Sequence, residues 1–412
     1  MQMKKAHSAA AAGIGNDLLD RVRGLVPALR ERATAAENLR RLPDETVADF
    51  GRLDLCKIWQ PKVYGGLETD LATGLEIMQE AARGCASSAW CLTVYQQHNW
   101  ILAHFPKAAQ DETIGTDPTL FPAAVLAPRG KARKVDGGYV VGGVWPFGSG
   151  CDHSAWMMFG ALVVDEAGAE IALDRKIYGV PALNARLCLV PRADVRIKGD
   201  WNTAGLAGTG SHSIAIDDVF VPEHRTLLIA DAIDGAAPGQ ALHRAPLFRS
   251  TYYSFLVTAL AGPAPGVAQG ALDCFLERIH QRVVAPMNLV QSNMIRTHRQ
   301  VAEAGAKIAI ARDLLRRNAE TIDQAAASGA TIPVERRAEI RLNAALAVHV
   351  SYEAGEIIFQ AAGGSALALA NPIQRAMRDL HGMKAHYFMD LETALELKGM
   401  VQLGRTPFTY IF

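Results

Sequence analysis

The spacing of apolar residues changes twice along the chain, and this order restricts the folds that the sequence can adopt. Apolar residues recur at helical spacing in residues 18–39 and 71–105. From about residue 120 to 228, short β-branched and aromatic runs are separated by glycine and aspartate, which is typical of strands joined by tight turns. Long periodic segments return after residue 247. The sequence therefore predicts helices, then a compact β-domain, then helices again.

The second helical part has the pattern of a bundle. Its long periodic segments contain few internal prolines, and helices of that length usually pack against one another. These segments are residues 294–326, 334–362 and 372–403. We therefore predict an α+β multi-domain protein with an N-terminal helical domain, a central β-barrel or β-sandwich domain and a C-terminal four-helix bundle. The predicted boundaries are residues 1–118, 119–232 and 233–412.

Charge and cysteine content bear on the partners and the compartment of the protein. The 42 basic and 42 acidic side chains cancel, so no overall field attracts nucleic acid or an anionic membrane surface. Residues 255–272 are uncharged but include Gly262, Pro263 and Pro265, which favours a buried helix start over a membrane span. The N-terminus has only a weak, alanine-rich apolar run, and the six cysteines form no C-x-x-C pair. We expect a cytoplasmic protein with free thiols and with no nucleic-acid or membrane partner.

Two glycine-rich segments of the β-domain are candidates for binding a planar, partly polar group. In WPFGSGCDHSAW, Trp145 and Phe147 precede a flexible turn that carries Ser149. In GLAGTGSHSIAIDDVFVP, Thr209 and Ser211 are short hydroxyl residues that alternate with glycines. Such segments expose backbone amides and hydroxyls without blocking the approach of a ligand. The alternatives are an ordinary β-turn beside a core tryptophan for the first segment and a structural loop for the second.

A third pattern lies near the C-terminus, in residues 360–386. Two glycines end an apolar helical run and permit close backbone approach, and Pro372 can open the next helix at its first turn. The segment resembles the C-terminal cofactor segment of the acyl-CoA dehydrogenase fold, whose pattern is Q-x-x-G-G followed by P-x-x-R-x-x-R-D. The matching residues are Gln360, Gly363, Gly364, Pro372, Arg375, Arg378 and Asp379. The order of helices, strands and helices also agrees with that fold, so the resemblance covers nearly the whole chain.

One position separates this chain from the dehydrogenases of that fold. They carry a catalytic glutamate about eight residues after the R-D pair, where this chain has Tyr387, and His386 directly precedes it. A histidine there is similar to the two-component flavin monooxygenases of the same fold, the group that includes 4-hydroxyphenylacetate 3-hydroxylase oxygenase components. The resemblance implies reduced flavin (FADH2 or FMNH2) and O2, a separate NAD(P)H:flavin reductase and a small aromatic substrate. It also implies a homotetramer in which helices of one subunit complete a neighbour's cofactor site.

The same resemblance assigns roles to individual residues. His98 is expected to take or share the proton of a phenol, and His386 to hydrogen-bond a C4a-hydroperoxyflavin. Ser149 is expected to hold a donor near flavin N5 and so to slow the release of H2O2. An unperturbed histidine has a pKa of about 6.5, which suits a base at neutral pH. The expected flavin-binding residues are Trp145, Phe147, Ser149, Thr209, Gly210, Ser211, Gln360, Gly363, Gly364, Arg378 and His381.

Several alternatives stay open from the sequence. An acyl-CoA dehydrogenase or oxidase would have to replace the missing glutamate, and Glu392 lies more than one turn beyond its position. Sulfur, nitrogen or indole oxidation, or hydroxylation of a steroid ring, fits the same fold, and a substrate without an acidic hydroxyl would not need His98 as a base. A flavin-binding protein without turnover would use both histidines in structural bonds only. No metal is expected, because His381 and His386 would lie about 140° apart around a helix.

Overall fold

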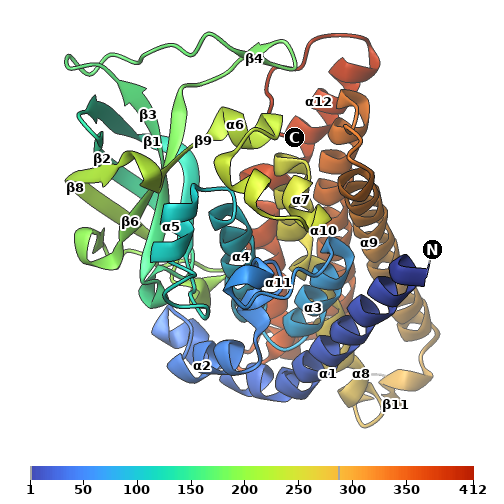
Figure 1. The fold of residues 1–412 in the computed structure, drawn as a ribbon. Coiled ribbons are helices and arrows are strands. Elements are labelled where there is room, and N and C mark those ends of the chain that lie inside the picture. Colours follow the sequence, from blue (N-terminus) through green and yellow to red (C-terminus); the bar gives the residue numbers. More distant parts are fainter. Residues whose placement is uncertain (1, 286–287) are drawn as a thin grey trace.

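The computed structural model describes residues 2–285 and 288–412, with side chains from residue 13 onward. It confirms the predicted succession of helices, sheet and helices (Figure 1). The N-terminal helices are α1 (Gln2–Leu39), α2 (Asp44–Arg52), α3 (Leu71–Ala82), α4 (Ala86–Leu102) and α5 (Lys107–Glu112). Apolar residues of these helices and of the C-terminal helices pack into one continuous hydrophobic core.

The central part forms one main sheet among the described residues, in the order β7-β8-β2-β1-β3-β6-β9. Its strands are β1 (Ala123–Val135), β2 (Gly138–Gly148), β3 (Trp156–Val164), β6 (Ala185–Pro191), β7 (Arg196–Ile197), β8 (His212–Pro222) and β9 (Thr226–Leu228); β4 (Lys176–Ile177) and β5 (Val180–Pro181) pair separately. β1 runs parallel to β3 and antiparallel to β2. The sheet has its own hydrophobic core, which explains why this part reads as a separate unit in the sequence.

The C-terminal part is helical, as predicted. It contains α6 (Ile229–Asp234), α7 (Tyr252–Ala261), α8 (Pro263–Ile279), α9 (Ile295–Ser328), α10 (Val334–Ala362), α11 (Pro372–Lys384) and α12 (Leu391–Gln402), with the short strands β10 (Val283–Val284) and β11 (Leu289–Val290) between α8 and α9. α10 packs against α8, α9, α11 and α12 and is the central helix of this bundle. The predicted domain boundaries at residues 118 and 232 stay a prediction.

The predicted single helix over residues 372–403 was wrong, because it is divided into α11 and α12. Asp390 accepts a hydrogen bond from the Thr393 backbone N–H at 2.8 Å and so caps the start of α12. His386 lies in the connection between the two helices and not on a long helix. The break between the two helices therefore sets the orientation of His386, a predicted catalytic residue.

α4 is the helix that joins the sheet to the bundle (Figure 1). All 17 of its residues are buried, so its polar side chains need protein partners. Gln96 donates to the Leu55 carbonyl and Gln97 to the Leu256 carbonyl, both at 2.7 Å. These bonds fix α4 to its neighbours on either side. The side chains that α4 directs toward the β-domain are therefore held in place from behind.

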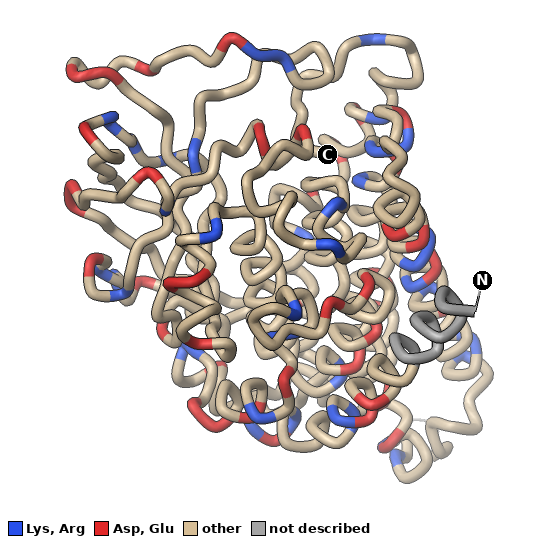
Figure 2. The backbone as a smooth tube through the Cα atoms, viewed as in Figure 1, with Lys and Arg blue, Asp and Glu red and all other residues tan. Residues whose placement is uncertain are grey.

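The surface carries charges of both signs (Figure 2), and the longest apolar stretch is buried in the fold. Figure 2 shows basic and acidic residues interspersed along the outer elements. One stretch, Tyr252–Ile279, is long and apolar enough to cross a membrane, but 94% of its most apolar window is buried inside the fold. This agrees with the predicted buried helix start. All six cysteines are free, as predicted, and five of them are buried.

Candidate active site

Three side chains of α4 reach the β-domain on successive turns of the helix. The Trp90 indole N–H donates to the Ser149 hydroxyl at 3.3 Å, and the Tyr95 hydroxyl donates to the Gly150 carbonyl at 2.8 Å. The His98 ring bonds the Pro122 carbonyl at 2.8 Å, directly before β1. One helix therefore carries His98 and contacts Ser149 through Trp90, so two of the three predicted catalytic residues lie along the same boundary.

Ser149 begins a chain of hydroxyl groups whose hydrogen direction can be deduced. Thr209 donates to the Leu206 carbonyl at 2.8 Å, because a carbonyl only accepts. The Ser211 and Thr209 oxygens are 2.6 Å apart, so Ser211 must supply the hydrogen between them. Ser149 and Ser211 are 2.7 Å apart, and by the same reasoning Ser149 donates to Ser211.

The Ser149 hydroxyl consequently has one unused lone pair and no unused hydrogen. Its hydrogen goes to Ser211, and one of its two lone pairs accepts the Trp90 N–H. The expectation that Ser149 presents a donor is corrected by this chain, because its single hydrogen is already used. Ser149 can accept one more hydrogen bond from a ligand.

The aromatic pair before Ser149 divides between core and surface. Trp145 has no exposed surface, donates to the Gly160 carbonyl at 2.7 Å and packs on Phe159 inside the sheet core. The prediction that Trp145 holds a flavin ring was therefore wrong, and the core-tryptophan alternative applies. Phe147 is 65% exposed and has a φ of +69°, a backbone conformation that costs free energy for a residue with a Cβ. Phe147 is the aromatic residue that a ligand can reach.

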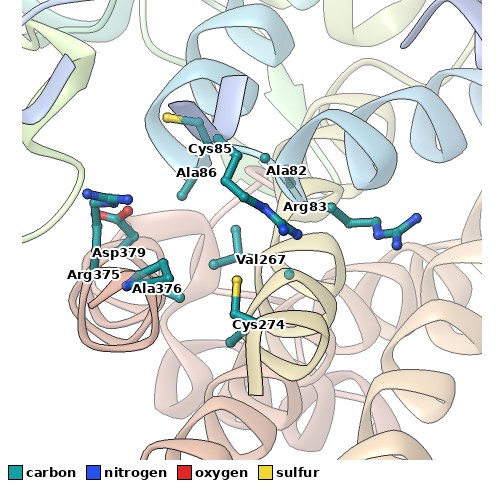
Figure 3. A pocket seen from close by; sticks show the side chains of 14 residues that line it. Ala82, Arg83, Cys85, Ala86, Val267, Cys274, Arg375, Ala376 and Asp379 are labelled. Carbon is teal, nitrogen blue, oxygen red and sulfur yellow. The ribbon is translucent and has the colours of Figure 1, made fainter. Parts of the chain in front are cut away.

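The loop that carries Thr209 and Ser211 is anchored from α11. The buried Asp379 carboxylate accepts the Leu206 backbone N–H at 2.6 Å, and Arg378 donates to the Ala204 carbonyl. Burial raises the pKa of Asp379 to about 7. Behind Asp379, a cavity of about 30 Å³ lies between α8, α11 and the start of α4 (Figure 3). That volume accommodates a water molecule or two and is far too small for a flavin.

Substitution of Gly205 tests this anchor. A Cβ there would lie 2.0 Å from the Arg378 carbonyl oxygen, which belongs to the backbone of α11 and cannot turn away. We expect Gly205→Ala to lower the free energy of unfolding by about 1–3 kcal/mol, measured by chemical denaturation. Gly305→Ala is the matched control, because a Cβ there meets nothing within 4 Å and the helix gains propensity. Equal stability of the two variants would contradict the close packing.

His98 is a neutral acceptor in this structure. A carbonyl cannot donate, so His98 Nδ1 carries the hydrogen that bonds Pro122, and Nε2 keeps its lone pair. Burial lowers the pKa of His98 to about 4. The pKa of about 6.5 assumed from the sequence is therefore too high. His98 Nε2 can accept a hydrogen bond throughout the neutral pH range.

His386 has the opposite tautomer. Its Nδ1 accepts the Phe388 backbone N–H at 3.1 Å, so Nε2 carries the hydrogen of the neutral ring. Burial, with a smaller contribution from Arg341, lowers the pKa of His386 to about 4. Arg341 also donates to the Tyr387 carbonyl at 3.1 Å and holds this segment to α10. The His386 ring lies edge-on to Trp90 with centroids 5.8 Å apart, so His386, Trp90 and Ser149 form one cluster.

Comparison with known proteins decides the family. The N-terminal domain of acyl-CoA dehydrogenases matches residues 16–115, and the C-terminal domain matches residues 258–391. The flavin-dependent monooxygenase oxygenase subunit HsaA of Mycobacterium tuberculosis is 34% identical over 99% of this chain and 98% of its own length. The chain belongs to the flavin-dependent monooxygenase oxygenase components of the acyl-CoA dehydrogenase fold. This confirms the resemblance stated from the C-terminal pattern.

Further relatives of this oxygenase component act on small phenols according to their names. The FADH2-dependent resorcinol hydroxylase of a Rhizobium species is 32% identical over 95% of both chains. The p-hydroxyphenylacetate 3-hydroxylase of Acinetobacter baumannii is 28% identical over 95% of this chain and 90% of its own. The structure of XiaF from a Streptomyces species, in complex with FADH2 and glycerol, superposes with a TM-score of 0.90 at 29% identity, covering 98% of this chain and 99% of that one. Oxygenase components receive reduced flavin from a separate reductase.

The structure does not bring every predicted residue of the oxygenase component together. Gln360 is exposed at the end of α10, where it bonds Glu356. Gly363 lies beside Arg282, and Gly364 is exposed. Arg282 donates to the Ala362 carbonyl and closes the end of this helix. Within the described part of the chain, no hydrogen bond connects this group to the Ser149 chain. His381 is also exposed and lies beside Tyr352.

Trp90 and Asp379 are site residues that the sequence analysis did not include among its binding or catalytic candidates. Asp379 was visible in the R-D pattern, but its partner Leu206 is 173 positions away in the sequence. Trp90 precedes His98 by about two helical turns, and this spacing predicts that both side chains lie on the same side of α4. Among the described residues, no group of three or more His, Cys, Asp or Glu side chains is placed to hold a metal ion.

Burial of neutral histidines predicts a pH dependence of stability. The pKa values of His98 and His104 are about 4 in the fold, below the ordinary 6.5, so the unfolded chain binds more protons between these values. Each histidine therefore lowers the free energy of unfolding as pH falls through this window, by up to about 2 kcal/mol at pH 5. The raised pKa of Asp379 acts in the opposite direction, so the comparison must be between variants.

The measurement is chemical denaturation of the wild type and of the double variant His98→Asn/His104→Asn between pH 5 and 7.5. Asparagine keeps a donor near the position of Nδ1 but does not titrate. We expect the difference in stability between the two proteins to shift in favour of the variant by several kcal/mol as the pH falls to 5. A difference that stays constant with pH would show that neither histidine has a lowered pKa.

Proposed function

We propose that this oxygenase component uses reduced flavin and O2 to hydroxylate a small phenol. The observation that carries the proposal is the pair of neutral histidines with opposite roles, an acceptor at His98 Nε2 and a donor at His386 Nε2. His98 lies on α4 together with Trp90, and the His386 ring packs against Trp90. A phenol needs an acceptor for its hydroxyl, and a reduced oxygen species needs a donor. The phenolic relatives support the substrate class.

The residues present fit a reduced isoalloxazine ring. Phe147 offers an exposed aromatic face, and Ser149 offers a free lone pair for the N5–H of reduced flavin. Thr209, Gly210 and Ser211 would line the polar edge, with Arg378 and His381 nearby on α11. When bound, reduced flavin supplies two electrons and activates O2. All remaining steps concern how the protein orients the substrate, excludes water and places protons.

Three predicted flavin-binding residues lie at the end of α10, apart from the Ser149 chain, and this supports a flavin site that two subunits share. Gln360, Gly363 and Gly364 are accessible and have no direct contact with the Ser149 chain of the same subunit. We propose that they bind the phosphate end of the flavin held by a neighbouring subunit, in a homotetramer. An open hollow of about 360 Å³ at the start of α9 is lined by Arg296, Arg299 and Glu303, so two guanidinium groups and one carboxylate leave a net positive charge in the same C-terminal part of the chain.

His98 would orient the substrate and share its proton. The pKa of a phenol is about 10, whereas burial holds the pKa of His98 at about 4. Complete transfer to His98 in the ground state is therefore unfavourable by several powers of ten. A hydrogen bond from the phenol to Nε2 still increases electron density on the ring and fixes which carbon faces the oxidant. The proton moves toward Nε2 as the carbon–oxygen bond forms.

His386 would supply the complementary hydrogen bond. Its Nε2–H is directed by the bond that Nδ1 accepts from Phe388. A fixed donor stabilises negative charge that develops on oxygen during transfer. Trp90, which contacts both His386 and Ser149, keeps water out of the space between them.

Acyl-CoA oxidation is the less favoured alternative. The side chain at the glutamate position is Tyr387, which is 50% exposed and lies against the Arg341 guanidinium. Glu392 is exposed in the first turn of α12. No carboxylate therefore replaces the missing base at this position. Oxidation of sulfur, nitrogen or indole is not favoured by any particular contact, although it would use the same flavin placement.

The test supplies the purified chain with FAD or FMN, an NAD(P)H:flavin reductase and a panel of phenols, indoles, thiophenes and acyl-CoA esters. We expect hydroxylated phenols and little reaction with the other classes. Turnover of acyl-CoA, or of indole in preference to every phenol, would contradict the proposal. The proposed cellular setting is the cytoplasm, where a reductase supplies reduced flavin by diffusion.

A further inference from the structure

The direction of hydrogen bonds in the Ser149 chain distinguishes the two redox forms of a flavin. Reduced flavin carries a hydrogen on N5 and donates there, whereas oxidised flavin has a bare N5 that only accepts. Ser149 has a free lone pair and no free hydrogen. It therefore pairs with the reduced form without any rearrangement.

The oxidised form would require a change in this chain. Ser149 could donate to N5 only by withdrawing its hydrogen from the buried Ser211, which breaks a bond of 2.7 Å. Reversal of the whole chain is blocked at its far end, because the Leu206 carbonyl cannot donate to Thr209. At the near end, the Trp90 indole N–H can only donate. Both ends therefore fix one direction.

We propose that Thr209 and Ser211 are positioning residues that make this site selective for reduced over oxidised flavin, by keeping the Ser149 hydrogen away from N5. The inference rests on the proposed placement of flavin N5 at Ser149. Its consequence is release of the oxidised product, which allows the next reduced flavin to enter. The residues act through Ser149 and need not touch the flavin ring themselves.

The anchoring of the loop supports a fixed chain. Leu206, whose carbonyl ends the chain, is held through its own N–H by Asp379 at 2.6 Å. Gly150, which follows Ser149, donates its N–H to the Thr209 carbonyl at 2.9 Å. The two segments that carry the hydroxyls are thus joined by backbone as well as side-chain bonds. The hydroxyl groups can rotate, but their oxygen atoms stay in place.

The test measures dissociation constants for oxidised and dithionite-reduced FAD and FMN under anaerobic conditions, in the wild type and in Ser211→Ala. The variant frees the Ser149 hydrogen, so we expect the ratio of the oxidised to the reduced dissociation constant to fall about tenfold, the value of one hydrogen bond. The midpoint potential of the bound flavin should fall by about 30 mV for that change in a two-electron couple. Neither readout requires turnover.

Controls separate this role from a merely structural one. Ser211→Thr keeps the hydroxyl and should keep the wild-type ratio, and Ser213→Ala, two residues along β8, should do the same. Thr209→Val removes the acceptor at the other end and should lower the ratio even where Ser211→Ala does not fold. An unchanged ratio in Ser211→Ala and Thr209→Val, with tight binding of reduced flavin, overturns this inference alone. Failure of the wild type to bind either form overturns the inference and the proposed function together.

Discussion

Replacement of His98 by asparagine is expected to lower the rate of phenol hydroxylation by about 10²-fold or more at neutral pH, while reduced flavin still binds. Asparagine retains a donor for the Pro122 carbonyl, which His98 bonds at 2.8 Å, but has no counterpart of Nε2. The substitution therefore removes the proposed acceptor and preserves the bond that orients the residue. Rapid mixing of the anaerobic reduced complex with O2 and a phenol, followed by product quantification, gives the rate.

His104 provides a matched control for this change. It lies six residues further along the chain, its Nδ1 bonds the Trp100 carbonyl at 2.9 Å, and burial also lowers its pKa to about 4. Its Nε2 is enclosed by protein and has no solvent-exposed surface. We expect His104→Asn to change stability but not the hydroxylation rate of the folded enzyme. A full rate in His98→Asn, or an equal loss in both variants, would contradict a role for His98 toward the substrate.

Replacement of Ser149 by alanine is expected to uncouple oxygen consumption from hydroxylation. The change removes the acceptor for N5–H and leaves the Trp90 N–H without its partner, so the flavin edge is less well fixed and more open to water. Loss of one such positioned group typically costs on the order of 10²–10³-fold in a catalysed step. We expect most of the consumed O2 to appear as H2O2 and hydroxylated product to fall correspondingly.

The control for this variant is Ser154→Ala. Ser154 is buried in the same turn and donates to the Gly150 carbonyl at 3.1 Å, but it makes no bond to Ser149 or Trp90. Its loss should lower stability without a change in the ratio of product to H2O2. If Ser149→Ala hydroxylates with wild-type coupling, Ser149 does not act at the flavin edge.

Much of this account could be predicted from the sequence, because local patterns decide it. The alternating runs that became β2, β3 and β8 and the long apolar periods that became α9 and α10 are local signals. The family followed from a pattern of glycine, proline and arginine over residues 360–386. The catalytic role of His386 stays a prediction, and the residue was assigned to a helix that ends at Lys384.

The remaining features depend on contacts between distant residues. Trp145 and Phe147 are two positions apart, so a regular strand would place them on the same face. The pairing of β2 with β8 is irregular between Trp145 and Gly148, and Phe147 has a φ of +69°, so Trp145 faces the core and Phe147 the surface. The tautomers of His98 and His386 depend on Pro122 and Phe388, which become partners only when the chain is folded. The direction of the hydrogen bonds in the Ser149 chain likewise follows only from the positions of hydroxyl oxygens on two separate loops. A sequence pattern gives the residue types, but it does not give the side-chain orientations, the tautomers or the hydrogen-bond directions.

The most direct test of the central claim is a single turnover with ¹⁸O2. The purified chain would be mixed anaerobically with dithionite-reduced FAD or FMN and a phenol, without any reductase, and then exposed to ¹⁸O2. The account predicts a hydroxylated phenol that carries one ¹⁸O atom per molecule, in an amount close to that of the bound reduced flavin. Formation of H2¹⁸O2 alone with every phenol, or a product without ¹⁸O, would contradict it.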